Sequence, residues 1–210
     1  VMPGETPGPD QIIVSNTFGL HAMLTQAGAE PRILPIAHDT EAALATVLGL
    51  VDDADLVITI GGSSVGDHDL VAKVAAQLGL ERAFHKVAMR PGKPLMSGRL
   101  GDAMMIGLPG NPVSAMVCGE IFVKPVIRAM QGLPAEPAPR ETAQLAAEIG
   151  SNGPREHYMR GRSEPDGRVT VFCRQDSSLL SVLGASDVLV VRPPKDGPRA
   201  AGDLVEIVRL

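Results

Sequence analysis

The chain has 210 residues and 44% hydrophobic residues, which is enough for one medium domain and a small second one. Its formal net charge of −5, with no Trp, one Tyr and four Phe, argues against a nucleic-acid surface and against platforms on which bases stack. No apolar stretch approaches the ~20 residues that cross a bilayer, and no signal peptide is recognisable. We therefore expect a soluble cytoplasmic protein with no membrane or nucleic-acid partner, and the non-Met first residue indicates that something upstream is missing.

The first two-thirds of the chain alternate between helix and strand patterns. Residues 16–28 ("NTFGLHAMLTQAG") predict a helix that Asn16 caps and Gly28 ends. The other expected elements are a strand at 31–36, a helix at 40–51, a strand at 55–60, a helix at 70–79, a strand at 103–108 and a helix at 113–130. This alternation predicts a three-layer, doubly wound, mostly parallel α/β sheet, with ligands outside the carboxyl ends of the strands.

The pattern changes at residues 132–142 ("GLPAEPAPRET"), a Pro-rich segment typical of a linker. Short strand patterns follow without a convincing amphipathic helix; they are "QLAAEI", "REHYMRGR", "RVTVFCR", "DVLVVRP" and "DLVEIVRL". Short strands separated by turn signals are typical of a small all-β, barrel-like domain. We therefore expect an α/β domain at 1–133, with its first strand missing, and a β domain at 134–210.

The segment "ITIGGSSVGDHDL" combines a buried strand with a glycine loop and then with carboxylates. Gly61, Gly62 and Gly66 let a ligand approach the main chain, and the following helix favours an oxyanion there. Asp39 and Asp69 each lie at the carboxyl end of an expected strand, where a pair of carboxylates can hold Mg²⁺. The alternative is that Asp39, and Asp67 or Asp69, are helix N-caps, and the residues alone favour this commoner use of Asp.

Two further loops carry polar groups on a stiff backbone. In "HKVAMRPGKP", Pro91 and Pro94 stiffen a loop that presents Lys86, Arg90 and Lys93, cations suited to phosphate or another oxyanion. The alternative is a solvated basic turn. In "GLPGNPVSA", Ser114 falls in the first turn of a helix, where backbone N–H groups are unpaired; the alternative is a tight turn alone. The other candidates are interpreted structurally: Cys118 and Cys173 as buried thiols, and His21, His68 and His157 as packing or surface residues.

Read in order, "GGSSVGDHD", "MRPGKP" and "GLPGNPVSA" resemble the signature loops of the molybdopterin molybdenumtransferase family, the MoeA and gephyrin E-domain type. The Pro-rich joint and the tail, including "REHYMRGR" and "QDSSLLSVLGASDVLVV", resemble that family's C-terminal domain. The resemblance implies a molybdopterin-binding α/β domain followed by a small barrel. It also implies Mg²⁺-dependent insertion of molybdate into adenylylated molybdopterin, with release of AMP. The implied partners are the pterin substrate, a second copy in a homodimer, and the adenylyltransferase of the pathway.

The resemblance also implies roles for individual residues. Asp39 and Asp69 match the family's functional aspartates and would handle the metal and the water. The molybdate pocket would take Lys93 and Ser114 from the first domain and Arg155 and Ser177 from the second. The residues implied in pterin or phosphate binding are Gly61, Gly62, Ser64, Gly66, Lys86, Arg90, Lys93 and Asn111.

Three departures from the family pattern stand beside these matches. The TGDE-like motif that precedes the matching segment in the family is absent, and so are two upstream domains; Arg90 replaces what is usually a lysine. We therefore expect residues 1–210 alone to fold but to insert little molybdenum. Two other functions stay open: the adenylyltransferase of the same fold, against which the barrel-like tail argues, and a non-catalytic module that binds the pterin or a partner.

Overall fold

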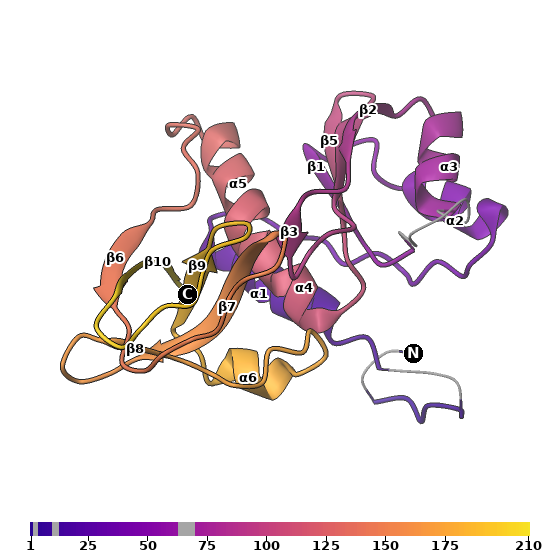
Figure 1. Cartoon of the computed structure of the whole chain (residues 1–210). Helices are drawn as coiled ribbons and strands as arrows, with labels where there is room; N and C mark the ends of the chain where they lie inside the picture. The colour runs from indigo at the N-terminus through magenta and orange to yellow at the C-terminus, as the bar shows by residue number, and fades with distance from the viewer. Residues whose placement is uncertain (2–3, 10–12, 63–69) are drawn as a thin grey trace. The chain divides into compact units, whose positions relative to one another are not determined.

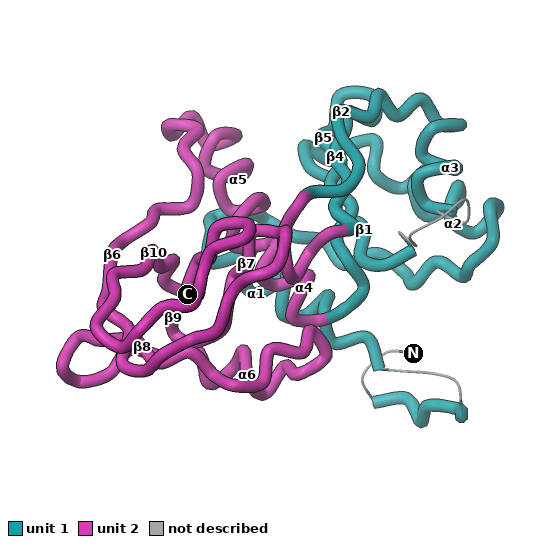
Figure 2. The backbone as a smooth tube through the Cα atoms, in the orientation of Figure 1, with its two compact units in different colours: residues 1–87, 94–111 teal, residues 88–93, 112–210 magenta. Residues whose placement is uncertain are grey.

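The computed structural model describes residues 1, 4–9, 13–62 and 70–210. The protein is of the mixed α/β class, as expected, and forms two compact units (Figure 2). The first unit contains residues 1–87 and 94–111, and the second contains residues 88–93 and 112–210. The expected domain boundary at 133/134 differs from this division by packing and stays a prediction.

The first unit is built on a four-stranded sheet with the order β1-β5-β4-β2. Its strands are β1 (Leu56–Ile60), β5 (Ala103–Leu108), β4 (Met96–Leu100) and β2 (Glu81–His85). β1 and β5 pair in parallel, as their apolar sequences predict, while the other two pairs are antiparallel. Antiparallel pairing arises because Gly101-Asp102 turns the chain directly from β4 into β5, a two-residue hairpin signal that we did not weigh.

Three helices belong to the first unit: α1 (Asn16–Gln26), α2 (Glu41–Leu48) and α3 (Leu70–Gln77). Val71, Val74 and Ala75 of α3 pack with residues of β1, β5 and α2 in one apolar cluster, and Figure 1 shows α2 and α3 beside each other. The three helices lie within the predicted ranges. α1, however, begins at Asn16 after Ser15, without a side-chain capping bond, so Asn16 is not the N-cap that we expected.

The strand expected at residues 31–36 does not form. Pro31 and Pro35 each lack a backbone N–H, which removes two donors from any ladder that this segment could join. The segment is fixed by side chains instead: Leu34 packs against the apolar cluster, and Arg32 donates to Asp53 at 2.6 Å. The described sheet therefore contains one parallel pair, where alternation of the elements predicted several.

The second unit contains a continuous helical run, which the sequence predicts at 113–130. It consists of α4 (Pro112–Cys118), a π-helical turn η1 (Gly119–Val123) and α5 (Lys124–Met130). A short helix α6 (Leu180–Gly184), which the sequence analysis missed, lies further along the chain. Cys118 of α4 is buried and Cys173 is exposed, so only the first of the two thiols is buried as expected; both are free.

The sheet of the second unit has the order β3-β7-β9-β10-β6, with β8 paired to β7 (Figure 1). The strands are β3 (Met89–Arg90), β6 (Glu141–Gln144), β7 (Glu156–Ser163), β8 (Val169–Val171), β9 (Val188–Arg192) and β10 (Leu204–Arg209). One isolated bridge, Leu145 with Val169, links the end of β6 to β8. Among the described residues no further ladder closes this sheet into a complete barrel.

The strand expected from Gln144 onward, "QLAAEI", begins earlier in the structure. β6 covers Glu141–Gln144 and pairs with β10, so the end of the Pro-rich segment already belongs to the sheet. Ion pairs hold this edge: Arg140 with Glu206 at 2.8 Å, and Arg209 with Glu141 at 2.9 Å. Pairing with a distant strand thus overrides a local composition that is typical of a linker.

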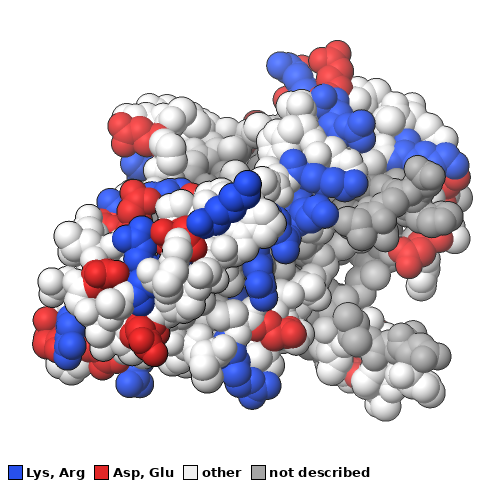
Figure 3. Space-filling view, viewed as in Figure 1, with Lys and Arg blue, Asp and Glu red and all other residues white. Residues whose placement is uncertain are grey.

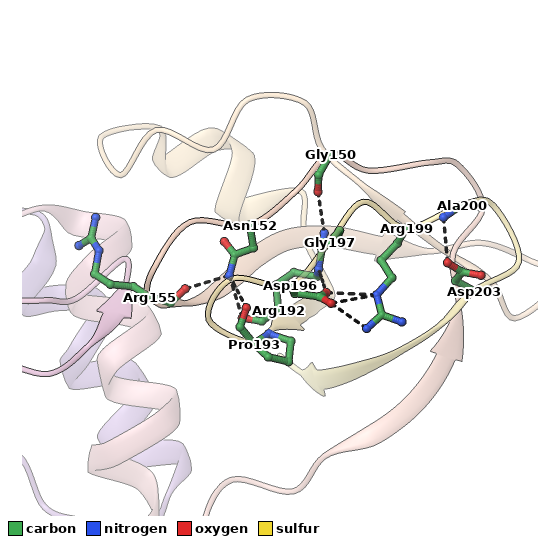
Figure 4. A network of polar contacts seen from close by, with 10 residues as sticks. All are labelled: Gly150, Asn152, Arg155, Arg192, Pro193, Asp196, Gly197, Arg199, Ala200 and Asp203. Atoms are coloured by element: carbon green, nitrogen blue, oxygen red, sulfur yellow. Dashed lines mark hydrogen bonds and ion pairs between the residues drawn. The ribbon is translucent and has the colours of Figure 1, made fainter.

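A polar network fixes the loop between β9 and β10 (Figure 4). Arg192 is 1% exposed and donates through Nε to Asp196 at 2.5 Å, while Arg199 donates to the other carboxylate oxygen at 2.8 Å. The hydrogen bond from Arg199, joined by that from Arg192, lowers the pKa of Asp196. Because the Arg192 guanidinium is buried, Asp196 is the group that keeps its charge compensated. No helix in the described part of the chain is long and apolar enough to cross a membrane.

Asp196→Ala is expected to lower the free energy of unfolding by about 3 kcal/mol or more, because it leaves the buried Arg192 charge without its partner. Urea unfolding followed by circular dichroism measures the change. Asp166→Ala is the matched control: it removes the partner of Arg168, but both side chains are about half exposed, so a loss below about 1 kcal/mol is expected. Equal losses in the two variants would contradict the structural role of Asp196.

Candidate functional site

The carboxyl ends of β1 and β5 meet at one edge of the first unit's sheet. Ile60 is in register with Leu108, and the backbone N–H of Gly61 donates to the carbonyl of Leu108 at 2.9 Å. A Cβ atom on Gly110 would lie 3.3 Å from Cα of Gly61. The chain after β1 and the chain after β5 therefore come into close contact through the backbones of Gly61 and Gly110.

Two side chains fix this edge from neighbouring helices. The amide of Asn16 donates to the carbonyl of Gly110 at 2.6 Å, so its function is to hold the loop after β5. Gly62 has φ +70°, and a Cβ atom there would lie 2.4 Å from a methyl carbon of Val71 in α3. A glycine is required because the left-handed backbone and the neighbouring helix both exclude a side chain. Asn111 follows as an exposed residue; Ser64, Gly66, Asp67 and Asp69 lie outside the described residues.

Asp39 is exposed and lies two residues before α2, and it is not the cap of that helix. Thr40 takes this position, and its hydroxyl oxygen accepts a hydrogen bond from the backbone N–H of Ala43 at 3.2 Å. The capping alternative is therefore wrong for Asp39. Among the described residues no three His, Cys, Asp or Glu side chains form a group that could hold a metal, and the pairing of Asp39 with Asp69 stays a prediction.

The basic segment "HKVAMRPGKP" is divided between the two units. Lys86 belongs to the first unit, where it has φ 74° and its backbone N–H donates to Leu95 at 2.7 Å. Arg90 and Lys93 belong to the second unit, and all three cations are exposed. Each unit is thus provided with cations from the same segment.

The loop that carries Lys93 is packed on α4. Gly92 has φ 115°, and a Cβ atom there would lie 2.5 Å from Sγ of Cys118. Burial raises the pKa of the Cys118 thiol to about 12, so this thiol is a packing partner and not a nucleophile. The close contact fixes the backbone one residue before Lys93.

The second unit brings the predicted molybdate residues onto connected segments. β3 pairs in parallel with β7, so that Arg90 lies beside His157, and Arg155 donates from Nη1 to the carbonyl of Met89 at 3.3 Å. The backbone N–H of Val113 donates to the carbonyl of Ser177 at 3.3 Å. The first contact places Arg155 next to the strand that precedes Lys93, and the second places Ser177 at the turn of α4 that contains Ser114.

Four arginines of the second unit act electrostatically on His157. His157 is buried, and its Nε2 has no hydrogen-bond partner among the described residues. Burial, and then the charges of Arg90, Arg160, Arg155 and Arg192, lower the pKa of His157 to about 4. Figure 3 shows acidic and basic side chains interspersed over the visible face of this unit, so the excess of positive charge around His157 is local.

Two members of this cluster, His157 and Arg160, were missed by the sequence analysis as site residues. Arg160 is completely buried and donates from Nη2 to the carbonyl of Asp176 at 3.1 Å, while its Nε and Nη1 have no partner among the described residues. The available signal was three arginines close together in the sequence: Arg155 just before β7, and Arg160 and Arg162 within it. The sequence does not predict that Arg160 is buried, because neither face of β7 is apolar throughout.

Comparison with known proteins gives the same assignment for both regions of the chain. Residues 4–129 match the family described as probable molybdopterin binding domain, and residues 142–210 match the MoeA C-terminal region, domain IV. A curated relative from Nostoc named molybdopterin molybdenumtransferase is 40% identical over 158 residues, which are 73% of this chain and 36% of that protein. Molybdopterin molybdenumtransferase 2 of Mycobacterium tuberculosis H37Rv is 36% identical over 212 residues, 98% of this chain and 52% of that protein.

A solved structure described as the molybdopterin biosynthesis MoeA protein of Pyrococcus horikoshii superposes with a TM-score of 0.83 at 25% identity. The match covers 100% of this chain and 51% of that one. The chain thus spans about half the length of that structure and of the longer curated match. The chain belongs to the MoeA-type molybdopterin molybdenumtransferase family, of which it carries the molybdopterin-binding and C-terminal regions.

Proposed function

We propose that this chain provides part of the site at which, in molybdenum cofactor biosynthesis, molybdate is inserted into adenylylated molybdopterin with release of AMP. The observation that carries the proposal is the second unit, where Lys93, Ser114, Arg155 and Ser177 lie on segments joined by main-chain contacts. Family membership supports the reaction class. The match to the MoeA C-terminal region favours this function over the adenylyltransferase of the same fold, which we expect as a single domain.

The donor set of the second unit suits a tetrahedral dianion. Molybdate offers four oxygens, and a lysine, an arginine and two hydroxyls supply charge-assisted hydrogen bonds to them. Arg155 is half-buried, and the partner found for its guanidinium is a carbonyl oxygen. It therefore carries a charge that no carboxylate of the described chain compensates by direct contact, and an anionic ligand would compensate it.

The edge of the first unit suits the pterin and its phosphates. Gly61 and Gly62, with Ser64, Gly66 and Asn111, would let these groups approach the main chain. Lys86 and Arg90 would each bind an anionic group of the substrate. Asp39 and Asp69 would hold Mg²⁺, which is commonly bound by one or two carboxylates and several waters. The exposed Asp39 carboxylate, which does not cap α2, fits this use. The ion would neutralise charge on the phosphoanhydride oxygens.

We place the protein in the cytoplasm as a homodimer that receives its substrate from the adenylyltransferase of the pathway. An assay with adenylylated molybdopterin, molybdate and Mg²⁺ separates the three candidate functions. Insertion releases AMP, the adenylyltransferase would consume ATP instead, and a non-catalytic module would bind the pterin without turnover.

Arg155→Met is expected to weaken molybdate binding about tenfold or more, because it removes a charge-assisted donor from the pocket. Isothermal titration calorimetry with micromolar molybdate measures the affinity. Arg168→Met is the control, since Arg168 is half-exposed and pairs with Asp166; it removes the same charge elsewhere in the unit. Arg155→Met with unchanged affinity would show that the anion does not use this arginine.

The pKa of His157 is expected to rise above about 4 when molybdate binds, because a dianion offsets the positive charges of Arg90 and Arg155. Titration of the imidazole signals by NMR, with and without molybdate at constant ionic strength, measures it. In the free protein, His157 stays neutral down to about pH 4, whereas in the unfolded chain it binds a proton below about pH 6.5. The folded state therefore loses stability as pH falls from about 6.5 toward 4, and the stability is complete with respect to this group above 6.5. Identical titrations in both samples would place the anion away from this cluster.

Asp39→Asn and Asp69→Asn are each expected to reduce AMP release in the complete protein by about 100-fold or more while leaving the fold intact, because Mg²⁺ loses a negative oxygen ligand. Asp52→Asn is the control, since Asp52 is also an exposed aspartate of the first unit. The measurement is the rate of AMP release at saturating Mg²⁺, with circular dichroism to check folding. Turnover at the wild-type rate in either variant would remove that aspartate from the metal site.

A further inference from the structure

The segment that carries Ser177 is held to β7 by the side-chain amide of Gln175. Oε1 of Gln175 accepts from the backbone N–H of Arg160 at 2.9 Å, and Nε2 donates to the carbonyl of the same residue at 2.9 Å. Nε2 also donates to the carbonyl of Phe172 at 2.7 Å. One amide therefore pairs with both main-chain groups of Arg160 and joins the two ends of the segment 172–175.

The residues on both sides of Ser177 are fixed as well. The carbonyl of Asp176 accepts from Nη2 of Arg160 at 3.1 Å, and the Asp176 carboxylate accepts from the N–H and the hydroxyl of Ser178 at 2.8 and 2.6 Å. The carbonyl of Ser177 accepts from Val113. Ser177 thus lies between two anchored neighbours, and both the amide of Gln175 and the guanidinium of Arg160 connect its segment to the same residue of β7.

We propose that Gln175 is a positioning residue that sets the place of Ser177 in the oxyanion site of the second unit. The inference rests on the proposed function, because that function assigns molybdate to Ser177 and Arg155. Gln175 acts through the backbone and need not touch the anion. It fixes the distance between the segment of Ser177 and the strand that follows Arg155, so that a hydroxyl and a guanidinium from different segments can bind one small ligand.

The chemistry of the position requires an amide. The observed contacts need one acceptor and two donors, which a glutamine provides in the orientation found here. A carboxylate could accept from Arg160, but it would turn a negative oxygen toward two carbonyls. A protonated glutamic acid again has one donor, and a methionine of similar length has none. Without Nε2, the half-buried carbonyl of Phe172 loses this donor, and the carbonyl of Arg160 keeps the backbone N–H of Phe172 at 3.0 Å. Losing a hydrogen-bond partner in this way is unfavourable, so we expect the segment to move in the variants that lack the donor.

The test uses micromolar molybdate as the probe, with calorimetry at pH 8 and pH 5.5 on the whole chain. Relative to wild type at the same pH, Gln175→Met is expected to bind about tenfold more weakly at both values. Gln175→Glu is expected to bind as weakly at pH 8 and to recover part of the loss at pH 5.5. The carbonyls of Arg160 and Phe172 would face the new carboxylate and raise its pKa above the ordinary value of about 4.3, and the protonated side chain regains a donor. Gln144→Glu is the control, because Gln144 is exposed on β6 and the substitution adds the same charge to the same unit. It is expected to leave the affinity for molybdate unchanged at both pH values.

Gln175→Met removes the hydrogen bonds without adding a charge, so it separates the effect of moving Ser177 from the effect of a new negative charge. Gln175→Met with wild-type affinity would overturn the proposal, since charge repulsion would then explain any effect of Gln175→Glu. Failure of Gln175→Glu to improve at pH 5.5 would also overturn it. Urea unfolding checks that each variant folds; if Gln175→Met does not fold, the comparison of Gln175→Glu at the two pH values decides.

Hydrogen exchange at the Val113 amide gives a readout that needs no ligand. This amide donates to Ser177, so Gln175→Met is expected to speed its exchange, whereas the amides of the central strand β9 keep their wild-type rates. Unchanged exchange at Val113 would contradict the positioning role. A wild-type protein that does not bind molybdate would contradict the proposed function, and the exchange measurement would still decide whether Gln175 holds the segment.

Discussion

The parallel pairing of the two-residue strand β3 with β7 is the constraint on which the candidate site of the second unit depends. It places Arg90 beside His157 and holds the segment that carries Lys93 next to Arg155. The pairing covers two residues, too few to be stable by itself. It is secured by the contact of Gly92 with Cys118 and by the guanidinium of Arg155 on the carbonyl of Met89. Packing and a candidate ligand-binding side chain thus stabilise the same strand.

Positive charge inside the second unit is treated in two different ways. Arg192 is buried and has Asp196 as a partner, which makes it a structural residue that fixes the loop after β9. Arg155 and Arg160 donate to carbonyl oxygens, which carry only partial charge. Arg160 interacts electrostatically with the Asp176 carboxylate, while no described carboxylate contacts Arg155 directly. Because burying a poorly compensated charge is unfavourable, the second pair is the one that an anionic ligand would stabilise. The partners of the arginines therefore distinguish a structural network from a candidate binding site.

The sequence patterns predicted the elements that consist of a buried apolar run. They failed where prolines prevent a strand and where contacts with residues distant in sequence determine the structure. The strands at 56–60 and 103–108 and the helical run from Pro112 are confirmed because β-branched and apolar residues dominate them. The strand at 31–36 was wrong because of its two prolines, and β3 was missed because two residues carry no periodicity. The order of the signature loops indicated the family, yet the role of Arg160 was not visible, since the burial of one arginine depends on the strands and loops that cover it.

Side-chain amides perform the same task at the edges of both units, and this explains how loops with few apolar residues can place ligand-binding groups. Asn16 holds the carbonyl of Gly110, and Asn152 donates to the carbonyls of Arg155 and Pro193 at 2.9 and 2.7 Å (Figure 4). Gln175 does the same for the segment of Ser177. Such loops cannot be fixed by hydrophobic packing, because the ligand needs access to their polar groups. An amide satisfies buried backbone carbonyls without adding charge, so it can fix a loop beside an oxyanion without repelling the ligand.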